Sequence, residues 1–169
     1  VLDLLGPQSP TLAGLEKPIL NELRPELDFA SKSVAKATLK LAGLKPAFAG
    51  AFNPGGDVQE IKFPSPAAGS QFCLEALNAH DGKEFTAVAE LDLVDANGAS
   101  IPHQDWSIAY VDSEELAGED GSASNAIDGQ SANFWHTAWK DSKPKHPHQL
   151  VIDLGKEVKV GGFRYTPRA

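Results

Sequence analysis

Short segments of alternating apolar and polar residues, separated by turn-forming pairs, limit most strongly how this chain folds. Residues 58–63 alternate in this way, residues 71–77 place Phe72 and Leu74 on one face, and residues 85–94 form a third such segment. Turn signals separate them: Asn53-Pro54, Gly55-Gly56, Asp81-Gly82 and the sequence DANG at 95–98. The pattern predicts short strands joined by turns, with residues 65–70 (SPAAGS) as a loop.

The remaining chain continues the same pattern. Residues 108–113 predict a short strand, and residues 148–155 and 158–167 predict two more that close the chain. Fifteen Gly and twelve Pro among 169 residues are many for a helical bundle and suit a protein rich in loops. The fold class we expect is all-β: an antiparallel β-sandwich of the jelly-roll type.

The N-terminal part of the chain differs in composition. Residues 1–28 contain four prolines and many leucines, which predict an irregular, partly helical arm or linker. Residues 29–45 fit a helix through Leu27, Val34, Thr38 and Leu41, and they fit a strand through Ala35, Ala37, Leu39 and Leu41. Both alternatives stay open. The domain organisation we expect is an arm over residues 1–45 and a sandwich over residues 46–169.

Charge and composition restrict the class of partner. The net charge of −8 argues against nucleic acid or an anionic membrane surface as partner. No apolar run reaches the roughly 20 residues that a membrane-spanning helix needs. The chain contains no Met, which we interpret as a processed product or part of a larger polypeptide. Cys73 is the only cysteine and cannot form an internal disulfide, so a buried, inert thiol is expected.

Residues 122–168 carry a resemblance to a known family. NAIDG, FWHTAW, a polar loop, VIDLG and GFRYTPR follow one another at close spacing. Together they resemble the first half of a discoidin-like domain, also called coagulation-factor type C, of the kind found as family 32 carbohydrate-binding modules. The resemblance implies a galactose-binding-domain-like β-sandwich that binds a sugar and carries no catalytic residues.

A second resemblance lies earlier in the chain, in residues 58–95. This part is similar to the last strands of the same family, so the two halves occur in swapped order. Two explanations stay open: a circular permutation that closes one sandwich, or a chain that straddles two neighbouring domains. Permutation is physically allowed because the termini of a sandwich commonly lie close together at the surface.

The resemblance implies a structural calcium ion in the loop NAIDGQSAN. Calcium prefers six to eight hard oxygen ligands, which backbone carbonyls and carboxylates of a tight turn can supply. The alternative is an ordinary Asp-Gly turn in which Asn125 and Asp128 bond their own backbone. The ligands carried over from the family are Glu90, Ala126, Asp128, Gln130 and Asn133.

The segment FWHTAWK predicts the sugar site. In galactose-binding members of the family, a His here and an Arg about thirty residues further on bond the sugar, and His136 and Arg168 match that spacing. An imidazole and a guanidinium together can recognise neighbouring hydroxyls. Trp139 is expected to be the stacking platform and Trp135 to lie in the core. The alternative is that His136 is a half-buried structural histidine and Trp139 a core or rim residue.

The function predicted from these residues is a non-catalytic carbohydrate-binding module for a galactose-type sugar. Its partners would be a glycan and a parent polypeptide or neighbouring subunit, and its location extracellular or periplasmic. The alternative is a structural or assembly sandwich without a working sugar site. For the polar sequence 140–149, which contains His146 and His148, we expect a solvated loop in preference to a zinc site.

Overall fold

The computed structural model describes residues 45–168. The chain from Pro46 onward forms one compact unit. The predicted arm, residues 1–28, lies outside the described residues, and so does the ambiguous segment 29–45 apart from its last residue. The predicted domain boundary therefore stays a prediction.

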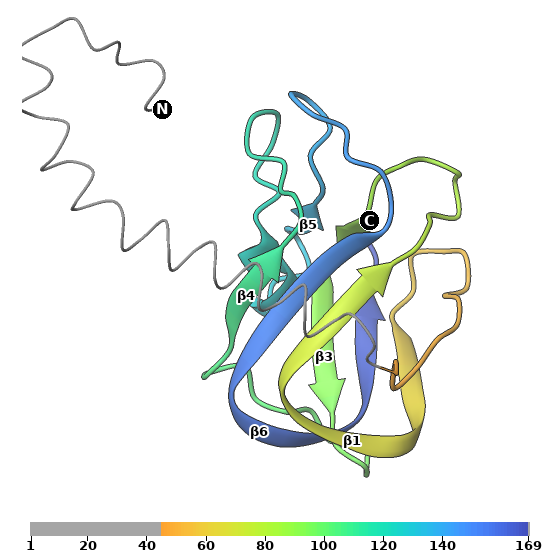
Figure 1. The fold of residues 1–169 in the computed structure, drawn as a ribbon, viewed down its shortest axis with the longest axis vertical. Coiled ribbons are helices and arrows are strands. Elements are labelled where there is room, and N and C mark those ends of the chain that lie inside the picture. Colours follow the sequence, from red (N-terminus) through yellow and green to blue (C-terminus); the bar gives the residue numbers. More distant parts are fainter. Residues whose placement is uncertain (1–44, 169) are drawn as a thin grey trace, which may run out of the picture. The chain divides into compact units, whose positions relative to one another are not determined.

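Strands dominate the described part of the chain (Figure 1). The elements are β1 (Gln59–Ala76), β2 (Ala87–Val88), β3 (Glu90–Val94), β4 (Ser107–Val111), the 3₁₀ helix η2 (Ala123–Ile127), β5 (Trp135–His136) and β6 (His148–Thr166). β1, β6 and β3 lie in that order in a four-stranded sheet, in which β4 also pairs with β6. β2 and β5 form a second, two-stranded sheet. Every pairing is antiparallel, and the predicted antiparallel β-sandwich is confirmed.

β6, the last strand of the chain, is the centre of the larger sheet. Its first half pairs with β4 and its second half with β3, while β1 follows it along most of its length (Figure 1). Strands from both halves of the sequence thus share one sheet, as a single sandwich with swapped halves requires.

The prediction of a loop at residues 65–70 is wrong, because this segment lies inside β1. Register shifts between Lys62 and Ala67 and between Gly69 and Gln71 allow the strand to bend without ending. β1 lies at the edge of its sheet among the described strands, where Pro64 and Pro66 are tolerated. Similarly, the two closing strands expected at 148–155 and 158–167 are the single, strongly curved β6.

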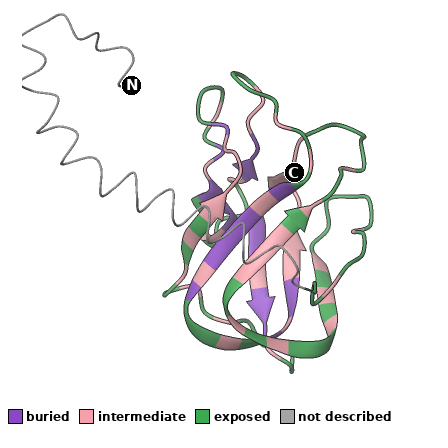
Figure 2. Ribbon diagram, in the orientation of Figure 1, coloured by how far each residue is buried: buried purple, intermediate pink, exposed green. Residues whose placement is uncertain are grey.

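The core is built from buried side chains of β2, β3, β5, β6 and η2, and buried residues are drawn in purple in Figure 2. Leu91 and Leu93 of β3 and Leu150 and Ile152 of β6 are fully buried, as their alternation in the sequence predicts. Trp135 of β5 completes the core at zero exposure. These apolar side chains fix the strands, and the loops that leave the strand ends are free to carry function.

Two adjacent glycines of β6 are needed where three strands approach closely. A Cβ on Gly161 would lie 2.5 Å from the carbonyl oxygen of Asp95, and one on Gly162 would collide with the carbonyl oxygen of Ile61. Both obstacles are backbone atoms, which cannot rotate away. We therefore expect Gly162→Ala to destabilise the protein by about 1–3 kcal/mol.

Urea denaturation tests this expectation. With an m-value of about 1–3 kcal/mol per molar, the midpoint should fall by about 1 M. Gly56→Ala is the matched control, because a Cβ there meets no atom within 4 Å. Equal midpoints for the Gly162 variant and the wild type would show that β6 does not need a glycine here.

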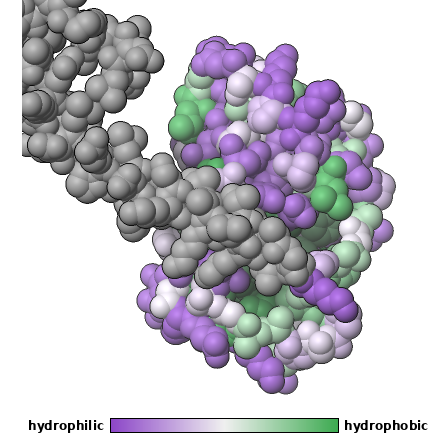
Figure 3. Space-filling model, viewed as in Figure 1, coloured by the Kyte–Doolittle hydropathy of each residue, from purple (hydrophilic) through white to green (hydrophobic). Residues whose placement is uncertain are grey.

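The surface of the described residues offers no broad apolar area. The large hydrophobic side chains that are well exposed, Val58, Leu77 and Leu116, come from different loops and strand ends. The face seen in Figure 3 is mainly hydrophilic, with hydrophobic residues in small separate groups. No helix within residues 45–168 has the length and apolar character needed to cross a membrane.

Candidate functional site

β5 carries the first residue of the predicted site. Trp135 and His136 pair with Val88 and Ala87 of β2, so their side chains leave the strand on opposite sides. Trp135 is buried in the core, and its Nε1 donates to the carbonyl oxygen of Ser113 over 3.0 Å. The expected core position of Trp135 is confirmed.

His136 lies beside the core with one ring nitrogen in use. Its Nδ1 is 2.6 Å from the carbonyl oxygen of Thr137, to which it donates. In the neutral ring Nε2 is then an acceptor, and none of the described residues bonds it. Within residues 45–168, only the Oδ1 of Asn133 is a fully buried side-chain polar atom lacking a partner. The unpaired Nε2 of His136 therefore keeps contact with solvent, although the residue is only 8% exposed.

Trp139 lies three residues further on and is held by the loop 115–121. Its indole Nε1 donates to Oε1 of Glu119 over 3.0 Å. A Cβ added to Gly118 would come within 2.6 Å of the indole ring, so the loop backbone packs directly against the ring. Trp139 is half-buried, which leaves part of the ring available for contact.

Arg168, just beyond the end of β6, extends its side chain to Phe134 and Glu119. Its guanidinium carbon lies 4.0 Å from the centre of the Phe134 ring, a cation–π contact. Its Nη2 is 3.5 Å from Oε2 of Glu119, and the side chain is 42% exposed. Phe134 also meets the ring of His136 edge-on, with 6.3 Å between centroids.

The structure thus brings the three sequence-predicted residues into one cluster. Glu119 connects Trp139 to Arg168, and Phe134 connects Arg168 to His136. We call these five residues the loop cluster. Sequence reasoning missed Glu119, which is one of 23 acidic residues and stands in an unremarkable turn sequence. The Glu-Asp pair between two glycines, at 119–120, was the only signal available.

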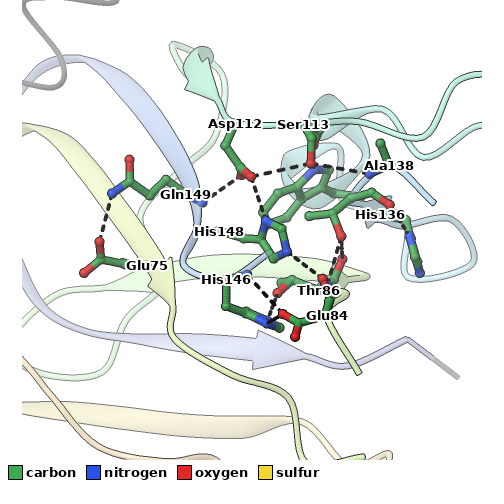
Figure 4. A network of polar contacts seen from close by, with 12 residues as sticks. Glu75, Glu84, Thr86, Asp112, Ser113, His136, Ala138, His146, His148 and Gln149 are labelled. Atoms are coloured by element: carbon green, nitrogen blue, oxygen red, sulfur yellow. Dashed lines mark hydrogen bonds and ion pairs between the residues drawn. The ribbon is translucent and has the colours of Figure 1, made fainter. Parts of the chain in front are cut away.

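Figure 4 shows a network of polar contacts that includes His136 of the loop cluster. Thr86 and Thr137 share three hydrogen bonds. The Thr86 amide donates to Oγ1 of Thr137 over 3.0 Å, and the Thr86 carbonyl oxygen accepts the Thr137 amide over 3.0 Å and its Oγ1 over 3.4 Å. The amide of Ala138 donates to Oγ of Ser113 over 3.4 Å. The segment that carries His136 and Trp139 is therefore fixed on both sides.

His148, the first residue of β6, is part of this network and corrects a prediction. Its Nδ1 lies 2.6 Å from Oδ2 of Asp112, and its Nε2 donates to the carbonyl oxygen of Glu84 over 2.8 Å. The residue is fully buried, and the His146 side chain is only 8% exposed. The expected solvated loop is wrong at these two histidines, because Glu84, Thr86 and Asp112 from other segments bond their rings.

The residues predicted to bind calcium form a second cluster next to η2. Oε1 of Glu90 accepts the amides of Gly129 and Gln130 over 2.8 and 3.2 Å. Asp128 accepts the Gln130 amide through Oδ1 over 2.8 Å and the Asn133 side-chain amide through Oδ2 over 2.8 Å. Ala126 is fully buried in η2 itself, and none of the side-chain bonds of the described residues involves it.

Two observations indicate that a cation fits this second cluster. Oδ1 of Asn133 is fully buried and has no hydrogen-bond partner. Burial raises the pKa of Glu90, and the neighbouring carboxylates of Asp92 and Asp128 add to the effect, against the Gly129 and Gln130 amides that lower it. An unpaired oxygen beside crowded carboxylates is a donor set that calcium prefers.

His103, which the sequence did not single out, contacts the loop 125–133 from its other side. Nδ1 of His103 donates to the carbonyl oxygen of Ile127 over 2.9 Å, and Nε2 is 3.1 Å from Oδ1 of Asp92. The Asp92 carboxylate raises the pKa of His103, and the hydrogen bond from His103 lowers the pKa of Asp92. Potential ligand atoms of Glu90, Asp92 and His103 lie within 4.8 Å of one another.

Comparison with known proteins finds a family match in the C-terminal part of the chain. Residues 109–169 match the model of the F5/8 type C domain family. Over 63 residues, 37% of the chain, the sequence is 52% identical to a sialidase of Micromonospora viridifaciens, of which the match covers 10%. Over 72 residues, 42% of the chain, it is 33% identical to a galactose oxidase of Gibberella zeae, again over 10% of that protein.

The family match covers the part of the chain that carries the loop cluster. It spans η2, β5 and β6 and contains every residue of the loop cluster, whereas β1 and β3 precede it. The chain corresponds to about a tenth of the length of the relatives that it matches. The discoidin-like resemblance is therefore confirmed over residues 109–169, which match the F5/8 type C domain family.

Proposed function

We propose that this protein is a non-catalytic carbohydrate-binding module that recognises a galactose-type sugar at the loop cluster. The observation that carries the proposal is the loop cluster itself, in which Glu119 joins Trp139 to Arg168 and Phe134 joins Arg168 to His136. The F5/8 type C family and the similarity to a sialidase and a galactose oxidase agree with a sugar as ligand.

The groups of the loop cluster differ in hydrogen-bonding capacity, and each matches a part of a sugar. Nε2 of His136 accepts a bond from one hydroxyl, and the Arg168 guanidinium donates to ring or hydroxyl oxygens. Glu119 offers a carboxylate between them, and the exposed part of the Trp139 indole covers the C–H face of the sugar. Donors, acceptors and an aromatic face together distinguish a sugar from a purely apolar or purely charged ligand.

The carboxylate of the loop cluster does not suggest catalysis. Glycoside hydrolysis needs two carboxyl groups that flank one bond, whereas Glu119 is engaged by the Trp139 indole and the Arg168 guanidinium. We therefore assign recognition to this domain and propose that any catalysis belongs to a linked domain of a parent polypeptide. Such a module raises the effective concentration of its partner domain on a glycan surface. We place it outside the cytoplasm, where such glycans are displayed.

A glycan array tests the proposed function. We expect binding to glycans with terminal galactose, and none to glycans in which the terminal galactose has been removed enzymatically. Absence of binding to every glycan, together with a stable protein complex, would instead establish the structural or assembly function.

We also propose that calcium binds at Glu90, Asp128, Gln130 and Asn133, with carbonyl oxygens of the η2 turn, including that of Ala126. The unpaired Oδ1 of Asn133 supports this assignment. When bound, calcium neutralises the carboxylates and rigidifies the loop. Asn125, seven per cent exposed, lies between this loop and the sugar site, because its Nδ2 donates to the carbonyl oxygens of Asp120 and Phe134 over 3.1 and 3.2 Å.

Calcium is expected to raise the melting temperature. At a free concentration 100 times its Kd, a ligand stabilises the native state by about 2.7 kcal/mol. For a unit of this size that corresponds to about 8–13 °C. Differential scanning fluorimetry in calcium against a chelator measures the shift.

Variants of two Asp-Gly turns make this test specific. Asp128→Asn should abolish most of the calcium-induced shift. Asp81→Asn is the matched control, because Asp81 accepts the amide two residues on over 3.0 Å, as Asp128 does over 2.8 Å. A wild-type melting temperature that is the same in calcium and in chelator would refute the calcium assignment.

A further inference from the structure

Glu115 is a buried carboxylate at the start of the loop that carries Glu119. The residue is 1% exposed, and four backbone amides donate to its side chain. Oε1 accepts the amides of Ala117 and Gly118 over 2.9 and 2.6 Å, within its own loop. Oε2 accepts the amides of Trp139 and Lys140 over 2.7 and 2.8 Å, on the segment opposite. One side chain thus joins the two segments that carry Trp139 and Glu119.

The backbone of Glu115 connects the same loop to His136. Its amide donates to the carbonyl oxygen of His136 over 2.8 Å, and its carbonyl oxygen accepts the amide of Gly121 over 2.8 Å. The amide of His136 in turn donates to the carbonyl oxygen of Gly121 over 3.1 Å. Glu115 therefore contacts the backbone of His136 directly and closes the loop 115–121 at its base.

The side chain is held in its charged form. The amides of Trp139, Lys140, Gly118 and Ala117 lower the pKa of Glu115 to about 2, against the opposing effect of burial. A carboxylate accepts four amides because it has two equivalent oxygens, each with two lone pairs. Glutamine has the same shape but only one accepting oxygen. Its NH₂ group would face two backbone amides, which are also donors, so these three N–H groups would lack acceptors.

We propose that Glu115 is the positioning residue of the sugar site, setting the Trp139 indole against the Glu119 carboxylate while itself touching no sugar. The inference rests on the proposed function. Two further contacts agree with it: Nζ of Lys140 donates to the carbonyl oxygen of Ala117 over 2.7 Å, and Gly118 packs against the Trp139 ring. The separation of the two segments is thus fixed at several points around one carboxylate.

Glu115→Gln tests the proposal by titration with D-galactose, well below the melting temperature of the variant. We expect affinity to fall about tenfold or more, and the Nε1–H resonance of Trp139 to move in the free protein as its bond to Glu119 is lost. Asp95→Asn is the control: its carboxylate accepts the amides of Asn97 and Ala99 over 2.8 and 2.9 Å at the other end of β3 from Glu90. That variant should lose stability and keep its affinity within about twofold.

The outcomes separate this inference from the proposed function. Wild-type protein that binds no galactose would refute the proposed function, and with it the positioning role. Wild-type protein that binds, with Glu115→Gln equal to it within about twofold and an unmoved Trp139 resonance, would refute the positioning role alone.

A second variant covers the case in which Glu115→Gln does not fold. Gly118→Ala leaves Glu115 intact and places a Cβ 2.6 Å from the Trp139 ring, which must then move. Gly118 is exposed, so folding is expected to be preserved. We expect weaker galactose binding and a shifted Trp139 resonance. Unchanged affinity with a displaced indole would show that the spacing between Trp139 and this loop does not matter for the site.

Discussion

Arg168→Ala is expected to weaken galactose binding by about 10- to 150-fold with little effect on folding. Each charge-assisted hydrogen bond to the sugar contributes about 1.5–3 kcal/mol, and tenfold in affinity corresponds to about 1.4 kcal/mol. The side chain is 42% exposed and its ion pair with Glu119 spans 3.5 Å. Its loss should therefore cost the folded state less than about 1 kcal/mol. Isothermal titration and thermal denaturation measure the two quantities.

Lysine variants of Arg168 and of Arg164, which lies on β6, provide the comparison. Arg168→Lys should restore little, because lysine keeps the charge and loses the planar fork of donors. Arg164→Lys removes a guanidinium that is bonded more extensively, to Glu60, Ser100 and the carbonyl oxygen of Gly98. Its galactose affinity should stay within about twofold of the wild type. Equal affinities for Arg168→Ala and the wild type would remove Arg168 from the site.

Trp139→Ala is expected to be the second most damaging change to recognition. A sugar face that covers about 60–100 Å² of apolar area contributes about 1.5–2.5 kcal/mol at about 25 cal/mol per Å². That corresponds to about a 10- to 70-fold loss of affinity. The bond from Nε1 to Glu119 is also lost, which leaves that carboxylate less well placed. Galactose should quench or shift tryptophan emission in the wild type and have no such effect in this variant.

Two further tryptophan variants show whether the aromatic face is responsible. Trp139→Phe keeps a ring and loses the Nε1 donor, so it should recover part of the affinity. Trp106→Ala removes another half-buried indole, which stacks on His103 with 4.0 Å between centroids, and should leave the affinity unchanged. Full affinity in Trp139→Ala would mean that the indole is a rim residue, as the alternative interpretation holds.

Strands and turns were predictable where they depend on residues that are close together in the sequence. Alternation along residues 148–155 places Leu150, Ile152 and Leu154 on the buried face, and each of them is fully buried. Gly82 and Gly98 adopt positive φ in the expected turns. The continuity of β1 through residues 65–70 was not predictable in this way. It depends on bulges that follow from pairing with β6, nearly a hundred residues later.

The candidate site was predictable only where a motif marks it. FWHTAW and the arginine of GFRYTPR gave His136, Trp139 and Arg168, and the fold places them together. Glu115 and Glu119 remained hidden, since a carboxylate that accepts backbone amides has no sequence signature. His148 was misjudged for a related reason: a polar neighbourhood in the sequence does not reveal that Asp112 and the Glu84 carbonyl bury its ring.

The most direct test of sugar recognition at the loop cluster is a nuclear magnetic resonance titration with D-galactose. A monosaccharide of about a dozen non-hydrogen atoms, at about −0.4 kcal/mol per atom, binds with a Kd of about 0.2–1 mM. We predict saturable shifts of His136, Trp139 and Arg168 resonances, and far weaker ones with D-glucose, the epimer at C4. Shifts confined to other residues, or no saturable shift up to about 100 mM galactose, would contradict the assignment of this cluster as a sugar site.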